Sequence, residues 1–402
     1  MAAEAIERRA PAQFDSGLAW LVAPLGRSRF LGEFWEQRPL TLTRHAPGYF
    51  GDLLSLDDID RVLTANLLRV EDVQLTDAAR EIGPTAYSHP SGVIDVARLF
   101  QLFADGSTIV MPQLHFRVPR LAELCRMLEN ELSARFQTNI YLTPGGAQGF
   151  KRHYDSHDVF ILQIAGRKHW RLYDSPIALP LRGQGFRPGD AGAGAQSAAF
   201  TLEPGDVAYI PRGMMHEAES DDEMSLHITV GVLVRTWHDL FVEAMSGVSL
   251  TDDAFRRSLP TGFVKAGFDR AGARLQFSDL LRRMADHMDF DSALDRFADE
   301  LVATRHPLLS DQLAQIAGLP GLTPDSIVAP RPDLLYRLQR TGEGIAIHCY
   351  GNVISLPAHA EEPIVAALAG RTAIRALPGT LDDDGKLVLV RRLVREGLLT
   401  AQ

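Results

Sequence analysis

Two short segments of this chain carry residue types that suit a metal centre. His153 and Asp155 stand two positions apart, and positions i and i+2 of an extended strand project from the same face. One strand can therefore present an imidazole and a carboxylate to a single point. Taken alone, the pair fits an ordinary surface contact better, because such pairs occur by chance in many proteins of this size.

The later segment EPGDVAYIPRGMMHEAE contributes a third candidate ligand. Gly205 and Gly213 indicate two turns, and the second turn is followed by His216. On a strand that faces His153 and Asp155, His216 would complete a set of two histidines and one carboxylate. Such a set binds one face of a metal ion and leaves the opposite face open, as a non-haem Fe(II) oxygenase requires. The alternative is a hydrogen-bonded turn histidine without a metal.

The strands that must position these residues lie in a β-rich region from about 137 to 235. Short β-type runs alternate there with Gly and Pro, and their sequences are NIYLT, VFILQIAG, HWRLY, FTLEPGDVAYIP and SLHITVGVLV. Several short strands at this spacing predict an antiparallel sandwich or barrel. One long glycine-rich interruption, residues 180–199, fits either a surface excursion or a lid over a site.

Helices are expected on both sides of this region. In the N-terminal part, the apolar spacing predicts helices over 56–68 and 121–136, both as packing elements. Residues 236–320 are expected to form amphipathic helices, whose apolar stripes either pack internally or form a subunit interface.

The end of the chain, about 330–402, has the proportions of a small winged-helix unit. DLLYRLQ predicts a helix, IAIHCYG and VISLP a hairpin, and EEPIVAALAG and KLVLVRRLVREGLL two further helices. Nine basic and eight acidic residues leave this part nearly neutral, which argues against a DNA-binding surface.

Composition narrows the class of protein. The 402 residues are enough for two or three domains, and 46% apolar with 23% charged residues is typical of a globular protein. A formal net charge of -10 disfavours a general nucleic-acid binder. Cys125 and Cys349 stand far apart, so we expect two reduced thiols rather than a zinc or redox site. The N-terminus has no apolar signal region, and no apolar run reaches the roughly 18 residues of a membrane span, so we expect a soluble cytoplasmic protein.

These segments together resemble the JmjC-type ribosomal oxygenases, the cupin-fold protein hydroxylases of bacteria and eukaryotes. The resemblance rests on His153-x-Asp155 with the distal His216, on the Gly/Pro/Gly/His turn, and on the flanking runs NIYLTPGGAQGF and DVFILQIAGRKHWRLY. FWEQRPLTLTRHAPGYFGDLLSLDDIDRVL at 34–63 is similar to the family's N-terminal segment, and LPGTLDDDGKLVLVRRLVREGLL at 377–399 to the end of its winged-helix domain. Nearly the whole chain is therefore covered.

The resemblance implies a mainly β fold with α-helices, divided into three parts. Residues 1–235 would form a JmjC/cupin double-stranded β-helix, with a helical N-terminal part and a barrel core at about 137–235. Residues 236–325 would form a helical dimerisation segment, which implies a homodimer, and residues 326–402 would form a winged-helix-like domain.

The resemblance also implies two cofactors, Fe(II) and 2-oxoglutarate, and the residues that bind them. The iron ligands would be His153, Asp155 and His216, and the keto-acid end of 2-oxoglutarate would chelate the iron. Lys168 matches the basic position that pairs with the far carboxylate, since a buried carboxylate needs a charged partner. Its alternative is an exposed lysine in a G-R-K turn. Asn139 and Tyr141 match positions that line the cosubstrate pocket.

Two further positions on the run SLHITVGVLV bear on the site. His227 resembles a family position near it, and we expect a packed core histidine or at most a residue behind the ligands. Gly231 stands where many family members carry a serine, so one hydrogen bond to the cosubstrate would be lost or replaced.

The activity that the resemblance implies is that of a 2-oxoglutarate-dependent dioxygenase, which hydroxylates a protein side chain with O₂ and releases succinate and CO₂. The implied substrate is a histidine or arginine of a ribosomal protein, and an acidic enzyme suits a basic ribosomal tail. Two kinds of alternative remain. The same chemistry could act on a biosynthetic peptide, a free amino acid or a methyl-lysine, or the chain could be a non-catalytic metal-binding cupin that works as a regulatory module.

Overall fold

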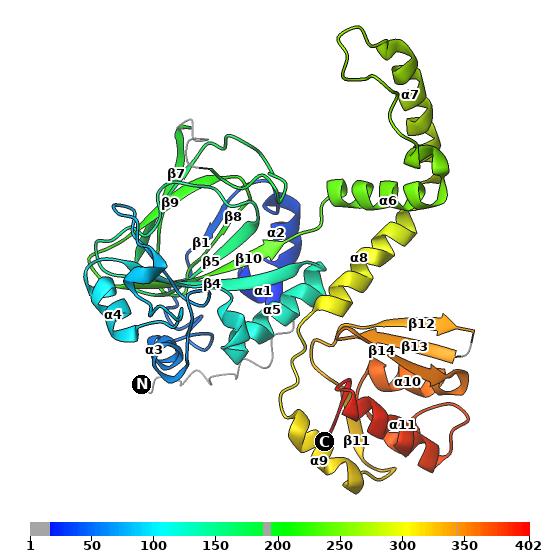
Figure 1. Cartoon of the computed structure of the whole chain (residues 1–402). Helices are drawn as coiled ribbons and strands as arrows, with labels where there is room; N and C mark the ends of the chain where they lie inside the picture. Colours follow the sequence, from blue (N-terminus) through cyan, green and yellow to red (C-terminus); the bar gives the residue numbers. More distant parts are fainter. Residues whose placement is uncertain (1–16, 188–193, 343) are drawn as a thin grey trace. The chain divides into compact units, whose positions relative to one another are not determined.

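The computed structural model describes residues 17–187, 194–342 and 344–402, coloured along the chain in Figure 1. The chain divides into two compact units, one ending at Val234 and the other beginning at Arg235. The interruption expected at 180–199 lies partly outside the described residues, because 188–193 are not among them. Its expected end is wrong, because strand β7 begins at Gln196.

The strands described in the first unit form two antiparallel sheets. The larger has seven strands in the order β1-β8-β5-β10-β4-β3-β2, and the smaller has three in the order β7-β6-β9. Their bounds are β1 Leu40–Leu42, β2 Gln74–Thr76, β3 Thr108–Met111, β4 Arg135–Thr143, β5 Asp158–Ala165, β6 Lys168–Tyr173, β7 Gln196–Leu202, β8 Val207–Ile210, β9 Met215–Ser220 and β10 Ser225–Leu233. The antiparallel strands predicted for 137–235 are confirmed.

Side chains alternate between two buried faces of the larger sheet. In β5, Phe160 and Leu162 belong to the main hydrophobic core, whereas Val159 and Ile161 belong to a second core. This second core also contains Trp170 of β6, so it lies between the two sheets. Burial on both faces explains the continuous apolar run VFIL in β5. β10 is also buried along most of its length, but Ser225, His227 and Thr229 alternate there with apolar residues.

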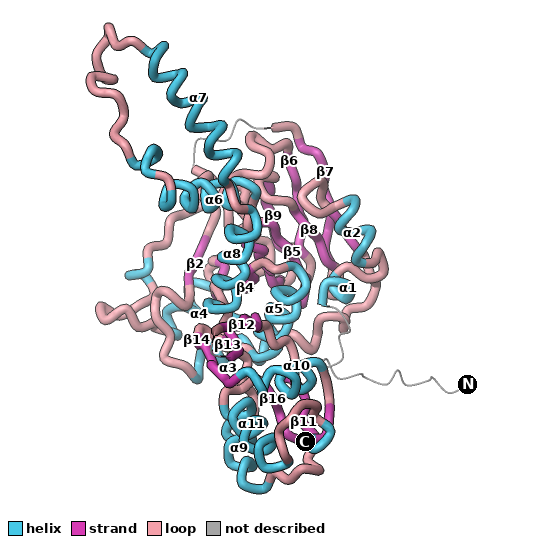
Figure 2. The backbone as a smooth tube through the Cα atoms, turned by 90° about the vertical axis from the view of Figure 1, so that its right-hand side faces the viewer, coloured by secondary structure: helices cyan, strands magenta, loops and turns pink. Residues whose placement is uncertain are grey.

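Helices cover the outer face of the larger sheet, and Figures 1 and 2 show α1, α2 and α5 along it. The helices of this unit are α1 Gly17–Leu21, α2 Arg27–Glu33, α3 Leu56–Ala65, α4 Val96–Ala104 and α5 Pro119–Leu132. Their apolar side chains form the main core together with β4, β5, β8 and β10.

Both helices predicted in the N-terminal part are present, but both end earlier than predicted. α3 begins after a capping box of Ser55 and Asp58, and it ends at Ala65 because Asn66 is extended. α5 ends at Leu132, since Ser133 adopts a φ of 49°. The extension predicted to residue 136 is wrong, because Phe136 lies in β4 and pairs with Val232.

The second unit combines helices with two three-stranded sheets, β12-β13-β14 and β15-β11-β16. Its helices are α6 Trp237–Thr251, α7 Arg270–His287, α8 Phe290–Thr304, α9 Gln312–Gly318, α10 Glu361–Ala369 and α11 Asp383–Arg395. Its strands are β11 Ile327–Pro330, β12 Arg337–Thr341, β13 Gly344–Cys349, β14 Asn352–Pro357, β15 Thr372–Ala373 and β16 Leu399–Ala401.

Most elements predicted for this unit are confirmed, with one exception. The helices within 236–320, the hairpin and the last two helices are present. The helix predicted for DLLYRLQ is wrong, because Asp333 adopts a φ of 56° and Arg337 begins strand β12, which pairs with β13. Among the described residues, no helix is long and apolar enough to cross a membrane.

Candidate metal centre

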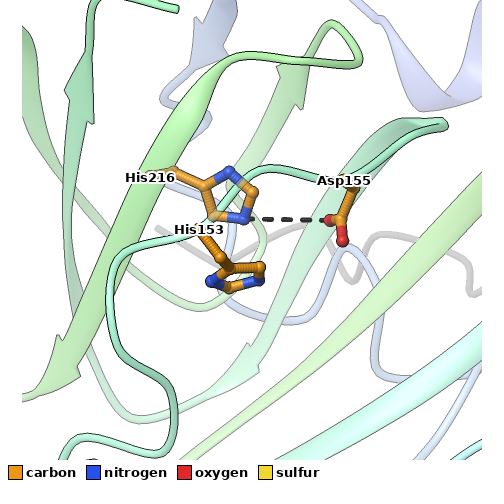
Figure 3. Close-up of side chains that lie close together, drawn as sticks. All are labelled: His153, Asp155 and His216. Carbon is orange, nitrogen blue, oxygen red and sulfur yellow. Dashed lines mark ion pairs between the residues drawn. The ribbon is translucent and has the colours of Figure 1, made fainter. Parts of the chain in front are cut away.

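His153, Asp155 and His216 come together at one point of the first unit (Figure 3). Each offers one ligand atom, and these atoms all lie within 4.8 Å of one another. His216 Nε2 is 3.8 Å from Asp155 Oδ2, and the centroids of the two imidazole rings are 4.6 Å apart. The three residue types, at these separations, match two histidines and one carboxylate around one ion.

The candidate ligands lie on two segments that pair through their backbones. His216 is in β9, as expected, but His153 and Asp155 precede β5 rather than lying within a regular strand. The expected strand position is wrong, yet the alternation of side chains survives. His153 and His216 exchange two backbone hydrogen bonds of 3.1 and 2.8 Å, and Tyr154 is buried with Tyr173 and Met215 instead.

Backbone carbonyls determine the tautomer of both histidines. His153 Nδ1 lies 2.9 Å from the Lys151 carbonyl oxygen, and His216 Nδ1 lies 3.0 Å from that of Met214. Because a carbonyl can only accept, each Nδ1 must carry the hydrogen, which leaves the lone pair on Nε2. His216 is therefore hydrogen-bonded at its turn, and its second nitrogen still faces Asp155.

The charge states of Asp155 and His216 suit a bound cation. Burial by itself would raise the pKa of Asp155, but the nearby histidines, His216 above all, hold the pKa below its ordinary value. Burial, together with the neighbouring His153, lowers the pKa of His216. At neutral pH this pair is therefore a carboxylate and a neutral imidazole, the forms in which these groups bind metals.

A buried ion pair joins the two ligand segments. Asp158 is fully buried, and its Oδ2 lies 2.7 Å from Nη1 of Arg212 in the turn before β9. Asp158 Oδ1 accepts hydrogen bonds from the Tyr209 hydroxyl at 2.7 Å and from the Arg212 amide at 3.4 Å. The adjacent Gly213 amide donates to the Asp155 carbonyl at 2.8 Å. These contacts connect the segment of Asp155 to the segment of His216.

The candidate ligands line a pocket between the two sheets. The other lining residues are Thr108, Tyr141, Gly149, Phe150, Val159, Ile161, Lys168, Trp170, Glu217, Ala218, His227 and Thr229. The lining is largely apolar and aromatic with a few polar groups, as is usual for small-molecule sites.

Lys168 is a buried member of this lining. It is the first residue of β6 and only 4% exposed, so the alternative of an exposed turn lysine is wrong. Its Nζ donates to Thr143 Oγ1 at 2.9 Å, and burial lowers the pKa of Lys168 to about 7. The ammonium thus lies in a low-dielectric site, where a negatively charged ligand would stabilise it.

Asn139 and Tyr141 differ in how they relate to the pocket. Tyr141 lines it, and burial together with the charge of Asp155 raises the pKa of its hydroxyl. Asn139 is not among the lining residues: its side chain hydrogen-bonds Tyr141, and its Oδ1 accepts from the Gln113 amide at 3.2 Å. Asn139 therefore contacts the pocket through Tyr141.

Two pocket-lining residues, His227 and Trp170, are not predicted as site residues from the sequence. His227, expected as a core histidine, lines the pocket and stacks on Tyr141 with centroids 4.7 Å apart. Trp170 was missed, although it lies two positions after Lys168 and must share its strand face. Gly231 lies beside His157 and leaves room for that imidazole, since a side-chain Cβ at position 231 would be only 2.8 Å from it.

The chain is similar to proteins of one family. Residues 112–240 match the JmjC domain family. Ribosomal oxygenase 1 of Rattus norvegicus is 31% identical over 401 residues, covering 89% of this chain and 64% of the relative. Ribosomal oxygenase 2 of the same organism is 31% identical over 290 residues, covering 69% and 62%. The bifunctional lysine-specific demethylase and histidyl-hydroxylase NO66 of Aedes aegypti is 30% identical over 298 residues, covering 70% and 46%. The chain thus spans from about half to two thirds of the length of these relatives.

Solved structures show the same fold. The Escherichia coli ribosomal oxygenase YcfD superposes with a TM-score of 0.54 at 18% identity, covering 94% of this chain and 98% of that one. Its complex with cobalt and 2-oxoglutarate gives a TM-score of 0.54 at 19% identity, covering 93% and 98%.

Asp158→Asn is expected to weaken both the fold and the metal centre, because it leaves Arg212 buried with less compensating charge. We expect the free energy of unfolding to fall by about 3 kcal/mol in guanidinium titration, and Mn²⁺ affinity to fall by about tenfold. Glu219→Gln is the matched control, since its partner Arg171 is 38% exposed and such pairs contribute under about 1 kcal/mol. Equal effects of the two variants would contradict the assignment.

Lys168→Met is expected to stabilise the unliganded protein at low pH. The pKa of Lys168 is about 7 in the folded protein and 10.5 ordinarily, so the unfolded chain binds the extra proton between those values. Stability from this group therefore rises as pH increases from about 7 to 10.5. Thermal unfolding should show a Tm several degrees above wild type at pH 6, and a smaller difference at pH 9.5. The exposed Lys151→Met should show no such trend; a pH-independent difference at Lys168 would exclude this cause.

Proposed function

This chain belongs to the JmjC-domain proteins related to the ribosomal oxygenases, and on that premise we propose that it is an Fe(II)- and 2-oxoglutarate-dependent dioxygenase that hydroxylates a side chain of a ribosomal protein. One observation carries the proposal. Two histidines and one carboxylate converge on one wall of a pocket that also holds a buried lysine.

The metal ligands in this proposal are His153, Asp155 and His216. The donor set fits Fe(II), because the hydrogen bonds at Nδ1 leave Nε2 of both histidines to bind the ion, and Asp155 is a carboxylate at neutral pH. Three ligands from the protein leave further positions on the ion for a cosubstrate and O₂.

Lys168 and Tyr141 bind the cosubstrate in this proposal, and Asn139 positions the Tyr141 hydroxyl. A dicarboxylate is favoured because one end needs the metal and the other needs a charged partner, which the buried Lys168 ammonium provides. When bound, iron and 2-oxoglutarate supply the oxidation of a C–H bond by O₂, with succinate and CO₂ as coproducts. Val159, Ile161 and Trp170 keep water away from that reaction.

A wider hollow at the pocket supports a macromolecular substrate. It is lined by residues 75–82, 149–157 and 185–186. His153, Asp155, Gly149 and Phe150 line both spaces, so a side chain entering the hollow can reach the candidate ligands. The net charge of -10 favours encounter with a basic ribosomal protein, and histidine or arginine is the side chain that we propose.

The second unit supports a homodimer in the same proposal, with 236–325 as the dimerisation segment and 326–402 as the winged-helix-like domain. Its helices α6, α7 and α8 carry many exposed apolar side chains, more than a monomer surface usually leaves open. The largest exposed fractions include Trp237 68%, Leu250 70%, Leu275 75% and Phe277 67%. We further propose a cytoplasmic location and no direct DNA binding.

Anaerobic visible absorption tests the iron and cosubstrate sites. Metal-free protein titrated with Fe(II) and then 2-oxoglutarate should develop a metal-to-ligand charge-transfer band. His216→Ala should lose the band, and Lys168→Ala should need about tenfold more 2-oxoglutarate, because a charged pair in a buried site is lost. Arg171→Gln, a change at a surface pair outside the pocket, should behave like wild type.

The same experiment separates the rival functions. A wild-type protein that binds one metal without the band would favour a non-catalytic metal-binding cupin. With the band established, mass spectrometry of ribosomal proteins incubated with the enzyme should detect one added oxygen on histidine or arginine. Loss of a methyl group from a methyl-lysine peptide instead would favour the demethylase named for the NO66 relative.

Light scattering tests the homodimer. The native particle should have twice the 44.3 kDa mass of one chain. Leu275→Asp combined with Phe277→Asp should give the monomer mass, because charges are costly in an apolar interface. Leu67→Asp changes a side chain that is 80% exposed in the first unit, and it should leave the dimer intact. A monomeric wild type would overturn the dimer.

A further inference from the structure

The pocket holds a polar side chain that the proposed function does not yet use. His227 lies in β10, lines the pocket and is only 3% exposed. Its Nδ1 is buried and has no hydrogen-bond partner among the described residues. Buried polar atoms in proteins are nearly always hydrogen-bonded, so an imidazole in this state at a ligand pocket indicates a partner that arrives with the ligand.

Packing holds the His227 ring in one orientation. His227 pairs with Tyr141 across β10 and β4, and the two rings are parallel within 2°. The Trp170 and His227 rings meet edge to face, with centroids 5.6 Å apart and an interplanar angle of 81°. Contacts with two rings hold the imidazole in place before any ligand binds, which reduces the entropy that binding costs.

The charges around His227 favour one kind of ligand group. Burial and the nearby Lys168 ammonium lower the pKa of His227 well below its ordinary value, so the imidazole is neutral. A neutral imidazole retains one N–H donor. A carboxylate offers two oxygens with about four acceptor positions, more than the Lys168 ammonium alone occupies. A cationic donor and a neutral donor lining the same pocket therefore match one carboxylate.

Resting on the proposed function, we propose that His227 donates a hydrogen bond to the distal carboxylate of 2-oxoglutarate, beside Lys168. His227 is then a cosubstrate-binding residue that selects a dicarboxylic keto acid over a monocarboxylic one.

Two ligands that share the keto-acid end separate this role from general packing. Calorimetric titration of the zinc-loaded protein is carried out with 2-oxoglutarate and with 2-oxopentanoate, which has a methyl group in place of the distal carboxylate. His227→Phe keeps an aromatic ring against Tyr141 and Trp170 but removes the donor. We expect its affinity for 2-oxoglutarate to fall about tenfold or more, and its affinity for 2-oxopentanoate to change by less than about threefold.

A matched control and a conservative variant complete the test. His115→Phe replaces another buried histidine of the first unit that does not line the pocket, and it should leave the ratio of the two affinities at the wild-type value. His227→Gln restores an N–H donor and should recover part of the ratio. An unchanged ratio in His227→Phe, or equal losses for both ligands, would overturn the role of His227 while leaving the proposed function intact.

Imidazole ¹⁵N spectra of the zinc-loaded wild type give a second measurement that does not depend on a variant folding. The His227 signal should shift on addition of 2-oxoglutarate and stay in place with 2-oxopentanoate. No shift at saturating 2-oxoglutarate would also overturn the inference. A wild type that binds zinc but does not bind 2-oxoglutarate would instead overturn the proposed function and this inference together.

Discussion

The buried ion pair between Asp158 and Arg212 is the constraint on which the candidate metal centre depends. Asp158 lies three residues after Asp155, and Arg212 four residues before His216, so the pair joins segments that are 54 residues apart beside both ligand sets. Separating the partners would leave a charge uncompensated inside the protein, which is strongly unfavourable. The backbone pairing of His153 with His216 then holds these two ligands next to each other.

Lys168 is a buried charge of a different kind. Asp158 has its cation and its hydrogen-bond donors within the protein, whereas Lys168 has the Thr143 hydroxyl and a pKa that burial lowers. The pairing of Asp158 stabilises the fold, whereas Lys168 leaves the pocket with a positive charge that no acidic side chain among the described residues is bonded to. Stability favours a buried charge that is paired within the protein, as Asp158 is, whereas ligand binding favours a buried charge that lacks a counter-ion, as Lys168 does in the part of the chain that the structure describes. Both residues lie in the first unit.

The pocket exists because the inner face of the larger sheet carries different side chains on different strands. Where β5 crosses, the inner face carries Val159 and Ile161, which pack against the smaller sheet. Where β4 and β10 cross, it carries Tyr141 and His227, while the neighbouring Ile140 and Ile228 remain in the core under the helices. Alternation lets one strand serve both purposes, since adjacent side chains point to opposite faces.

The sequence by itself determined the candidate ligands, the antiparallel strands and most helices, because residue types, turn glycines and local periodicity are local properties. It also indicated the family, through motifs spread along most of the chain. The tertiary structure decided what depends on distant partners. The apolar residues of DLLYRLQ have helical spacing, yet Arg337 lies in a strand that pairs with β13. The periodicity of apolar residues alone does not reveal that pairing. The arrangement of strands across the two sheets decides three further features, and the spacing of residues in the sequence does not show which strands face each other. These features are the burial of Lys168, the position of Asn139 behind Tyr141 and the place of His227 in the pocket.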